Sequence, residues 1–117
     1  MQFFSRLFNP VPENFQHLDI GQYKNDYLGK TGHVLIDVRT PGEFSEGHLP
    51  GAISIPLDQL PRRVGEVPKG QPIVVVCATG NRSLTGANIL ADAGHELVYN
   101  LKGGTLIWRM RGGPLER

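Results

Sequence analysis

The chain has 117 residues, of which 39% are hydrophobic, and this length and composition fit one compact domain with a single core. The formal net charge of +1 shows no excess of either sign, so it gives no support to nucleic acid or a membrane surface as a partner. One cysteine excludes an intramolecular disulfide, and with four scattered histidines it offers no zinc-ligand spacing, so neither a metal nor a cofactor is expected.

Residues 1–14 are predicted to form an N-terminal arm, and residues 15–117 the folded domain. Pro10 and Pro12 separate the two, because proline lacks an N–H donor and restricts the residue before it. Four apolar side chains of the arm would share one face of a short helix: Phe3, Phe4, Leu7 and Phe8. We expect this face to dock on the domain's own core, the alternative being a partner or a membrane. No stretch is long and apolar enough for a signal sequence or a membrane span, so the expected location is cytoplasmic.

After the arm, short strands alternate with helices. In chain order, the patterns predict a strand at 15–18, a helix at 20–28, a strand at 33–38, a short helix from 41 that stops at Gly47, a strand at 52–55, a helix at 57–64, a strand at 73–77, a helix at 82–93, a strand at 97–101 and a last helix through Trp108. Asp19 is typical of a helix N-cap, and Thr40 with Glu43 has the spacing of a capping box.

The strands at 33–38 and 73–77 are apolar almost throughout, which is typical of strands covered on both faces. Together with the alternation of strands and helices, they predict an α/β domain with a mainly parallel sheet and helices on both faces. Ligands of such sheets bind beyond the carboxyl ends of the strands. Cys77 and the turn at 37–39 are both predicted to lie at that edge.

Cys77 ends the second of these strands and is followed by a loop of small and polar residues. A free cysteine is most often a small buried hydrophobe, but a core cysteine would lie inside the apolar run rather than at its end. A loop that opens a helix surrounds the sulfur with backbone N–H groups, which favour the thiolate. The position therefore predicts a reactive thiol.

Several segments around Cys77 form a specific pattern. In chain order they are Leu-Ile-Asp-Val-Arg at 35–39, Glu-Phe at 43–44, Gly-His-Leu-Pro-Gly-Ala at 47–52, the cysteine loop at 76–83, and Gly103-Gly104 with Trp108. This pattern resembles the single-domain rhodaneses over roughly residues 15–115. The resemblance implies the three-layer rhodanese-like fold, with a mainly parallel central sheet of about five strands. It also implies a sulfurtransferase, in which Cys77 takes a sulfane sulfur from a donor such as thiosulfate, holds it as a persulfide and passes it to cyanide or a thiol.

The resemblance assigns a substrate-binding loop to Ala78, Thr79, Gly80, Asn81, Arg82 and Ser83. Small residues let this backbone curl around the sulfur, and Gly80 is free to adopt a positive φ. Arg82 offers a charged fork of donors to an anionic sulfur donor, its alternative being a structural ion pair. The Ser83 hydroxyl either donates to the site or caps the following helix.

A supporting network is expected from Asp37, Arg39, Glu43 and His48. Buried polar groups need partners, so Arg39 is expected to pair with a nearby carboxylate and His48 to bond to neighbouring backbone. An alternative role for Asp37 is to orient Arg82 or a loop amide. Gly103, Gly104 and Trp108 are expected to serve close helix packing and the core rather than chemistry.

Other functions fit parts of the pattern. Cysteine-dependent phosphatases and arsenate reductases also place a cysteine below an anion-binding loop that ends in arginine, but those loops resemble Cys-x5-Arg. Cys77 to Arg82 is Cys-x4-Arg, a tighter ring that suits one sulfur atom. A non-enzymatic relay that delivers the persulfide to a partner protein, or an interaction module, is the remaining alternative. The intact cysteine loop argues against a module that has lost its chemistry, but it does not separate a relay from an enzyme.

Overall fold

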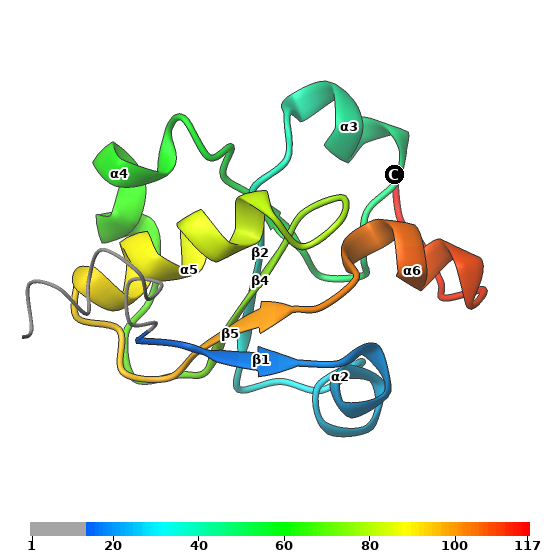
Figure 1. Ribbon diagram of the computed structural model, residues 1–117, viewed down its shortest axis with the longest axis horizontal. Coiled ribbons are helices and arrows are strands. Elements are labelled where there is room, and N and C mark those ends of the chain that lie inside the picture. The colour runs from blue at the N-terminus through cyan, green and yellow to red at the C-terminus, as the bar shows by residue number, and fades with distance from the viewer. Residues whose placement is uncertain (1–13) are drawn as a thin grey trace, which may run out of the picture.

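The computed structural model describes residues 14–117, so the expectations for Phe3, Phe4, Leu7 and Phe8 in the arm lie outside the described residues. A sheet of five parallel strands forms the centre of the domain (Figure 1). The strands are β1 (Gln16–Leu18), β2 (Val34–Asp37), β3 (Ile53–Ser54), β4 (Ile73–Val76) and β5 (Val98–Leu101). The α/β fold with about five central strands is therefore confirmed.

Helices cover both faces of the sheet. They are α2 (Ile20–Asp26), α3 (Pro41–Glu46), α4 (Leu60–Arg63), the 3₁₀ helix η1 (Val64–Glu66), α5 (Arg82–Asp92) and α6 (Gly104–Met110). Side chains of α4 and α5 pack with one set of strand residues, and those of α2 and α6 with the other set. The result is a three-layer arrangement (Figure 1). None of the helices within residues 14–117 has the length and apolar character needed to cross a membrane.

Strands β2 and β4 are buried on both faces, as their sequence predicts. Val75 faces the core under α5, whereas Val74 and Val76 face the core under α2 and α6. All three valines are 0% exposed. Burying an apolar side chain of this size stabilises the folded state by about 1.5–3 kcal/mol, so these strands anchor the sheet.

The strand order β1-β5-β4-β2-β3 places β4 between β5 and β2. In the parallel register, Val76 of β4 lies opposite Asp37 of β2. Cys77 therefore leaves the sheet at the same edge as the turn that follows Asp37, which confirms the predicted meeting of these two segments.

Two helices are shorter than predicted by more than one residue. The helix predicted at 57–64 begins only at Leu60, because Pro61 has no N–H to donate and is tolerated only in the first turn of a helix. The same segment then continues as the 3₁₀ helix η1. The helix predicted to reach Leu28 ends at Asp26, and the Leu28 N–H instead closes a turn onto the carbonyl oxygen of Tyr23.

Candidate active site

The Cys77 side chain lies at the carboxyl end of β4 and is 0% exposed. The loop that follows it is short, because α5 begins at Arg82. This loop folds back on the sulfur, so that the Gly80 N–H donates a hydrogen bond of 3.1 Å to Cys77 Sγ. Gly80 has a φ of +99°, in the left-handed region that a side chain would disfavour. The loop conformation therefore favours glycine at position 80, as the sequence predicts.

The start of α6 fixes the orientation of the loop. Two of its N–H groups, from Thr105 and Leu106, donate bonds of 2.9 Å to the carbonyl oxygens of Cys77 and Ala78. With these carbonyl groups turned toward α6, the amide groups of the loop are left to face the sulfur. A Cβ at Gly104 would collide with the same two carbonyl oxygens, so the close approach predicted for this glycine is present.

The loop lowers the pKa of the Cys77 thiol. Burial raises this pKa, but the Ser83 hydroxyl and the backbone N–H groups of Ser83, Gly80 and Thr79 together lower it by more. Hydrogen bonds to a thiolate favour the charged form, which is the form that acts as a nucleophile. The environment of Cys77 thus favours the reactive state of its sulfur.

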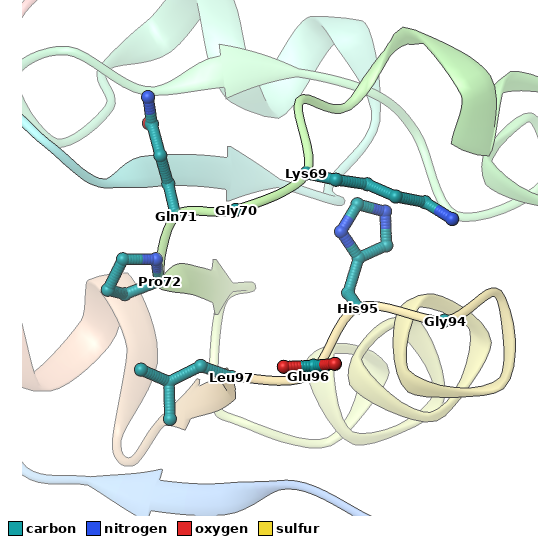
Figure 2. A pocket seen from close by; sticks show the side chains of 8 residues that line it. All are labelled: Lys69, Gly70, Gln71, Pro72, Gly94, His95, Glu96 and Leu97. Atoms are coloured by element: carbon teal, nitrogen blue, oxygen red, sulfur yellow. The ribbon is translucent and has the colours of Figure 1, made fainter.

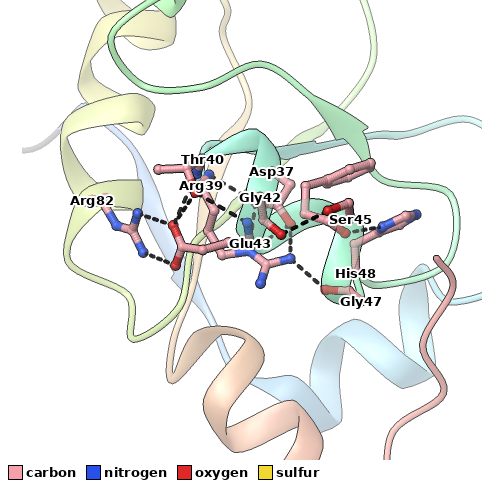
Figure 3. Close-up of polar contacts among 10 residues, drawn as sticks. Asp37, Arg39, Thr40, Gly42, Glu43, Ser45, Gly47, His48 and Arg82 are labelled. Carbon is pink, nitrogen blue, oxygen red and sulfur yellow. Dashed lines mark hydrogen bonds and ion pairs between the residues drawn. The ribbon is translucent and has the colours of Figure 1, made fainter.

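Arg82 forms a two-point ion pair with Glu43 of α3 (Figure 3). Its Nη1 and Nη2 lie 2.7 and 2.9 Å from Glu43 Oε1 and Oε2. This contact, the largest of the causes, lowers the pKa of Glu43 to about 2, and bonds from Thr40 contribute to the same shift. This pair is the structural ion pair that the sequence offers as the alternative role of Arg82, and binding of an anionic sulfur donor by Arg82 stays a prediction.

Asp37 and Arg39 form a second, buried ion pair at the end of β2. Arg39 Nη2 lies 2.8 Å from Asp37 Oδ2, and the same nitrogen donates to the carbonyl oxygen of Gly47 at 2.8 Å. The expectation that Arg39 pairs with a carboxylate is confirmed. Asp37 uses both carboxylate oxygens on Arg39, and within residues 14–117 no hydrogen bond joins it to Arg82 or to an amide of the cysteine loop.

His48 packs against α3 rather than against the cysteine loop. Its ring stacks on Phe44 with ring centroids 3.7 Å apart, and its Nδ1 lies 2.9 Å from the carbonyl oxygen of Phe44. The backbone of His48 also pairs with that of Glu116. Within the described residues, no hydrogen bond joins Cys77 to Asp37, Arg39 or His48. Among the described members of this group, Glu43 connects with the loop by hydrogen bonds, through Arg82.

Asn100 and His17 are site neighbours that the sequence analysis did not identify. Ser83 Oγ lies 3.3 Å from Cys77 Sγ and 2.5 Å from Asn100 Oδ1, so its hydroxyl does not cap α5. Asn100 Nδ2 in turn lies 3.3 Å from His17 Nδ1. The available signal in the sequence was an asparagine within the strand predicted at 97–101, since an amide that such a strand buries needs polar partners.

Two hollows lie at opposite edges of the sheet. One of about 490 Å³ adjoins Arg82 and is lined largely by apolar groups, including Val38, Pro41, Pro56 and Leu57. The other, of about 390 Å³, lies before β4 and β5 and is lined by Lys69, Gly70, Gln71, Pro72, Gly94, His95, Glu96 and Leu97 (Figure 2). The second hollow is at the edge away from Cys77.

His95 lies in this far hollow, beside Lys69. Figure 2 shows its ring beside the side chain of Lys69. Burial lowers the pKa of His95, and the nearby Lys69 lowers it further. Across residues 14–117, no group of three or more His, Cys, Asp or Glu side chains comes together in a way that could hold a metal ion.

Comparisons with known proteins agree with this geometry. A model of the rhodanese-like domain family matches residues 21–111. The sulfurtransferase of Allochromatium vinosum is 37% identical over 82 residues, which cover 70% of this chain and 77% of that protein. The thiosulfate sulfurtransferase GlpE of Shewanella oneidensis is 32% identical over 95 residues, which cover 81% of this chain and 93% of that protein.

The fold is also similar to solved structures. The crystal structure of a rhodanese-related protein from Thermoplasma volcanium matches this fold with a TM-score of 0.78, at 24% identity. The match covers 87% of this chain and 98% of that one. The likeness therefore shows the fold over most of the chain.

Proposed function

The chain belongs to the rhodanese-like domain family, and from this membership we propose that it is a sulfurtransferase that carries a sulfane sulfur as a persulfide on Cys77. The observation that carries the proposal is the loop geometry: a short loop turns its N–H groups toward one sulfur atom. Relatives named thiosulfate sulfurtransferase support thiosulfate as a donor. The acceptor is a small thiophilic nucleophile, cyanide or a thiol, or a thiol of a partner protein.

In the first half-reaction the Cys77 thiolate attacks the outer sulfur of thiosulfate. A new S–S bond forms to Cys77 Sγ, the S–S bond of thiosulfate breaks, and its electron pair leaves with sulfite. The products are the Cys77 persulfide and sulfite, and the total charge is unchanged. The N–H groups of Gly80, Thr79 and Ser83 favour the thiolate that begins this step.

In the second half-reaction the acceptor attacks the outer sulfur of the persulfide. With cyanide, a C–S bond forms, the S–S bond breaks and Cys77 is released as the thiolate, with thiocyanate as product. The loop amides then stabilise the departing thiolate as its charge develops. One set of donors thus serves both half-reactions, because negative charge on Sγ is present at the start of the first and at the end of the second.

Access to the sulfur requires movement, because Cys77 is 0% exposed. The hollow of about 490 Å³ beside Arg82 lies on one side of the loop and provides space for a donor or acceptor. Its apolar lining favours an uncharged organic group next to the reacting sulfur. Displacement of side chains around the loop would then join this hollow to the thiol.

Mass spectrometry of the intact full chain after incubation with thiosulfate tests the proposal. The expected result is the gain of one sulfur atom, its loss on addition of cyanide, and no gain in Cys77→Ser. Because Cys77 is the only cysteine, the added mass is assigned without digestion. Thermal unfolding of Cys77→Ser is the control for folding. A sulfur gain that persists in Cys77→Ser, or its absence from the parent with thiosulfate and with organic persulfides alike, would overturn the proposal.

A further inference from the structure

A chain of hydrogen bonds leads from Cys77 through Ser83 and Asn100 to His17. Ser83 lies in the first turn of α5, Asn100 on β5 and His17 on the neighbouring strand β1. Asn100 and His17 are direct partners in the parallel register, which brings their side chains together. Ser83 and Asn100 are buried, whereas His17 is exposed. The chain therefore connects the buried sulfur with the surface of the edge strand.

The chemistry of the amide sets the direction of these bonds. Asn100 Oδ1 can only accept, so the Ser83 hydroxyl hydrogen lies in the 2.5 Å bond to Asn100. Ser83 has no second hydrogen, so the 3.3 Å contact with Cys77 is one in which the thiol donates to Ser83 Oγ. Asn100 Nδ2 can only donate, so His17 Nδ1, at 3.3 Å, accepts and its ring hydrogen is on Nε2. Every bond of the chain therefore points away from the sulfur.

A thiolate cannot take part in a chain with this direction, because it has no hydrogen to donate. We propose that Ser83, Asn100 and His17 form a reversible hydrogen-bond chain, which turns the Ser83 hydroxyl hydrogen toward Cys77 when the sulfur is anionic and toward Asn100 when it is neutral. In the reversed chain, His17 Nδ1–H donates to Asn100 Oδ1, Nδ2–H donates to Ser83 Oγ, and the hydroxyl donates to the thiolate. Asn100 and His17 are positioning residues that act on the sulfur through Ser83.

Reversal needs no movement of the backbone, of Ser83 Oγ or of the His17 ring. A half-turn of the Asn100 amide exchanges its oxygen and its nitrogen, and the Ser83 hydroxyl rotates about one bond. The thiol proton passes to water, and exposed His17 exchanges its ring proton with water as its tautomer changes. The other charged groups beside the loop are Arg82 of α5, Glu43 of α3 and the Asp37 and Arg39 pair. These four residues are unchanged in the variants of Cys77, Ser83, Asn100 and His17 that test the hydrogen-bond chain.

The chain serves the reaction proposed above, and this role rests on that proposal. When Sγ is bonded to the transferred sulfur it carries no charge, and the hydroxyl hydrogen returns to Asn100. As the acceptor removes the outer sulfur, charge develops on Sγ and the hydroxyl turns back to stabilise it. A fixed donor would oppose one of the two states, whereas a reversible chain keeps every buried polar group satisfied in both.

Nitrogen-15 NMR of the His17 ring in the full chain tests the reversal directly. Spectra are recorded at a pH where the thiolate absorbance of the parent has reached its plateau, so that Cys77 is ionised. The expected hydrogen position is Nδ1 in the parent and Nε2 in Cys77→Ser, whose hydroxyl remains a neutral donor. Ser83→Ala breaks the hydrogen-bond chain. Adding Cys77→Ser to this variant is therefore expected to leave the His17 tautomer unchanged. His17→Gln identifies the signal among those of the four histidines. The same tautomer in the parent and in Cys77→Ser would overturn the proposal.

Asn100→Asp provides a second test, because a carboxylate accepts but cannot donate. The Ser83 hydroxyl would then stay on Asp, and the pKa of Cys77 is expected to rise. Thiolate absorbance measured against pH gives this pKa, with Cys77→Ser as the blank. The added negative charge raises the pKa by itself, so the same change is made in Ser83→Ala. We expect Asn100→Asp to raise the pKa of Cys77 by about one unit more when Ser83 is present than in the Ser83→Ala background. This difference is about the value of one charge-assisted hydrogen bond. Equal rises in both backgrounds would show a charge effect only and would contradict the chain.

These measurements test the reversible hydrogen-bond chain and the sulfurtransferase function independently of each other. The tautomer and the thiol titration report on hydrogen bonds in the resting protein, and neither requires a sulfur donor. Sulfur gain by the parent reports on transfer and does not depend on His17. If the parent gains sulfur but the His17 tautomer is the same in the parent and in Cys77→Ser, the proposed reversal of the hydrogen-bond chain alone would be overturned. If the His17 tautomer changes as expected but the parent gains no sulfur from any donor, the proposed sulfurtransferase function alone would be overturned.

Discussion

Arg82 and Glu43, 39 residues apart in the sequence, form a two-point ion pair that joins the first turns of α5 and α3 beside the cysteine loop. Glu43 also completes the capping box of α3, through the Thr40 N–H at 3.1 Å. A single carboxylate thus starts one helix and holds the arginine of the loop on the other. Both terminal nitrogens of Arg82 are engaged, so an anionic donor competes with Glu43 for them.

Removing the charge of Glu43 is expected to strengthen the binding of anionic sulfur donors to Arg82. Glu43→Gln keeps the capping box, because glutamine serves at the same position, but it removes the charge that engages Arg82. We expect the KM for thiosulfate to fall by about three- to tenfold, and Arg82→Ala to raise it by a similar factor. Steady-state sulfurtransfer to cyanide measures both changes.

The control compares donors of different charge. Benzenethiosulfonate presents the same outer sulfur but carries one negative charge, whereas thiosulfate carries two. Because a charge-assisted contact weakens as the ligand charge falls, both substitutions are expected to change its KM less. Equal changes for the two donors would mean that Arg82 acts by holding the loop in shape rather than by binding charge.

The same pair predicts a pH dependence of stability. The pKa of Glu43 is lowered from 4.5 to about 2, so the pair stabilises the folded state above pH 4.5 and loses this effect as the pH falls toward 2. The side chains of Arg82 and Glu43 are 39% and 34% exposed, and solvent screening limits the contribution to about 0.2–1 kcal/mol. Urea unfolding of the parent and Glu43→Gln measures it. The difference between them is expected to be constant near neutral pH and to disappear below about pH 2, where Glu43 is protonated in both the folded and unfolded states. A difference independent of pH would contradict an ionic origin.

Gly104→Ala is expected to disturb the loop as well as the helix that begins there. Its φ is +60°, and a Cβ would collide with the carbonyl oxygens of Cys77 and Ala78. We expect a loss of about 2–4 kcal/mol in the free energy of unfolding and a higher thiol pKa, because the displaced loop amides no longer surround the sulfur. Gly29→Ala is the matched control: its φ is +73°, but no atom lies within 4 Å of the added Cβ. It should lose about 1–2 kcal/mol and keep the thiol pKa. A thiol pKa equal in the two variants would separate the α6 contact from the chemistry of Cys77.

How far the sequence predicts the site depends on how local each interaction is. The strand that ends at Cys77, the capping box of Glu43 and the positive φ of Gly80 follow from neighbouring residues. The pairing of Arg82 with Glu43 and the contact of Asn100 with Ser83 join segments far apart in the chain. No periodicity or spacing carries such information, because these partners are set by strand order and register.

The length of the cysteine loop distinguishes sulfur transfer from phosphate chemistry, and an inserted residue tests this argument. Cys77 and Arg82 are separated by four residues, and the Gly80 N–H lies 3.1 Å from the sulfur, in reach of a single atom. A glycine inserted between Gly80 and Asn81 should widen the ring of amides, so that they move away from Sγ and toward the oxygens of a tetrahedral anion. Thiosulfate-dependent sulfurtransfer is expected to fall at least about tenfold, the loss that follows from about 1.4 kcal/mol of transition-state stabilisation.

The matched control is a glycine inserted after Gly70, at the edge of the sheet away from Cys77, which adds the same residue without changing the ring. It should keep most of the sulfurtransfer activity. In the loop variant, binding of phosphate or arsenate is expected to rise from undetectable to weak, without efficient hydrolysis, because a phosphatase also needs a placed general acid. Paired assays of sulfurtransfer and aryl phosphate hydrolysis, run on the parent and both variants, measure these outcomes. A parent that hydrolyses aryl phosphates faster than it transfers sulfur would contradict the loop-length argument and move the function to the phosphatase class.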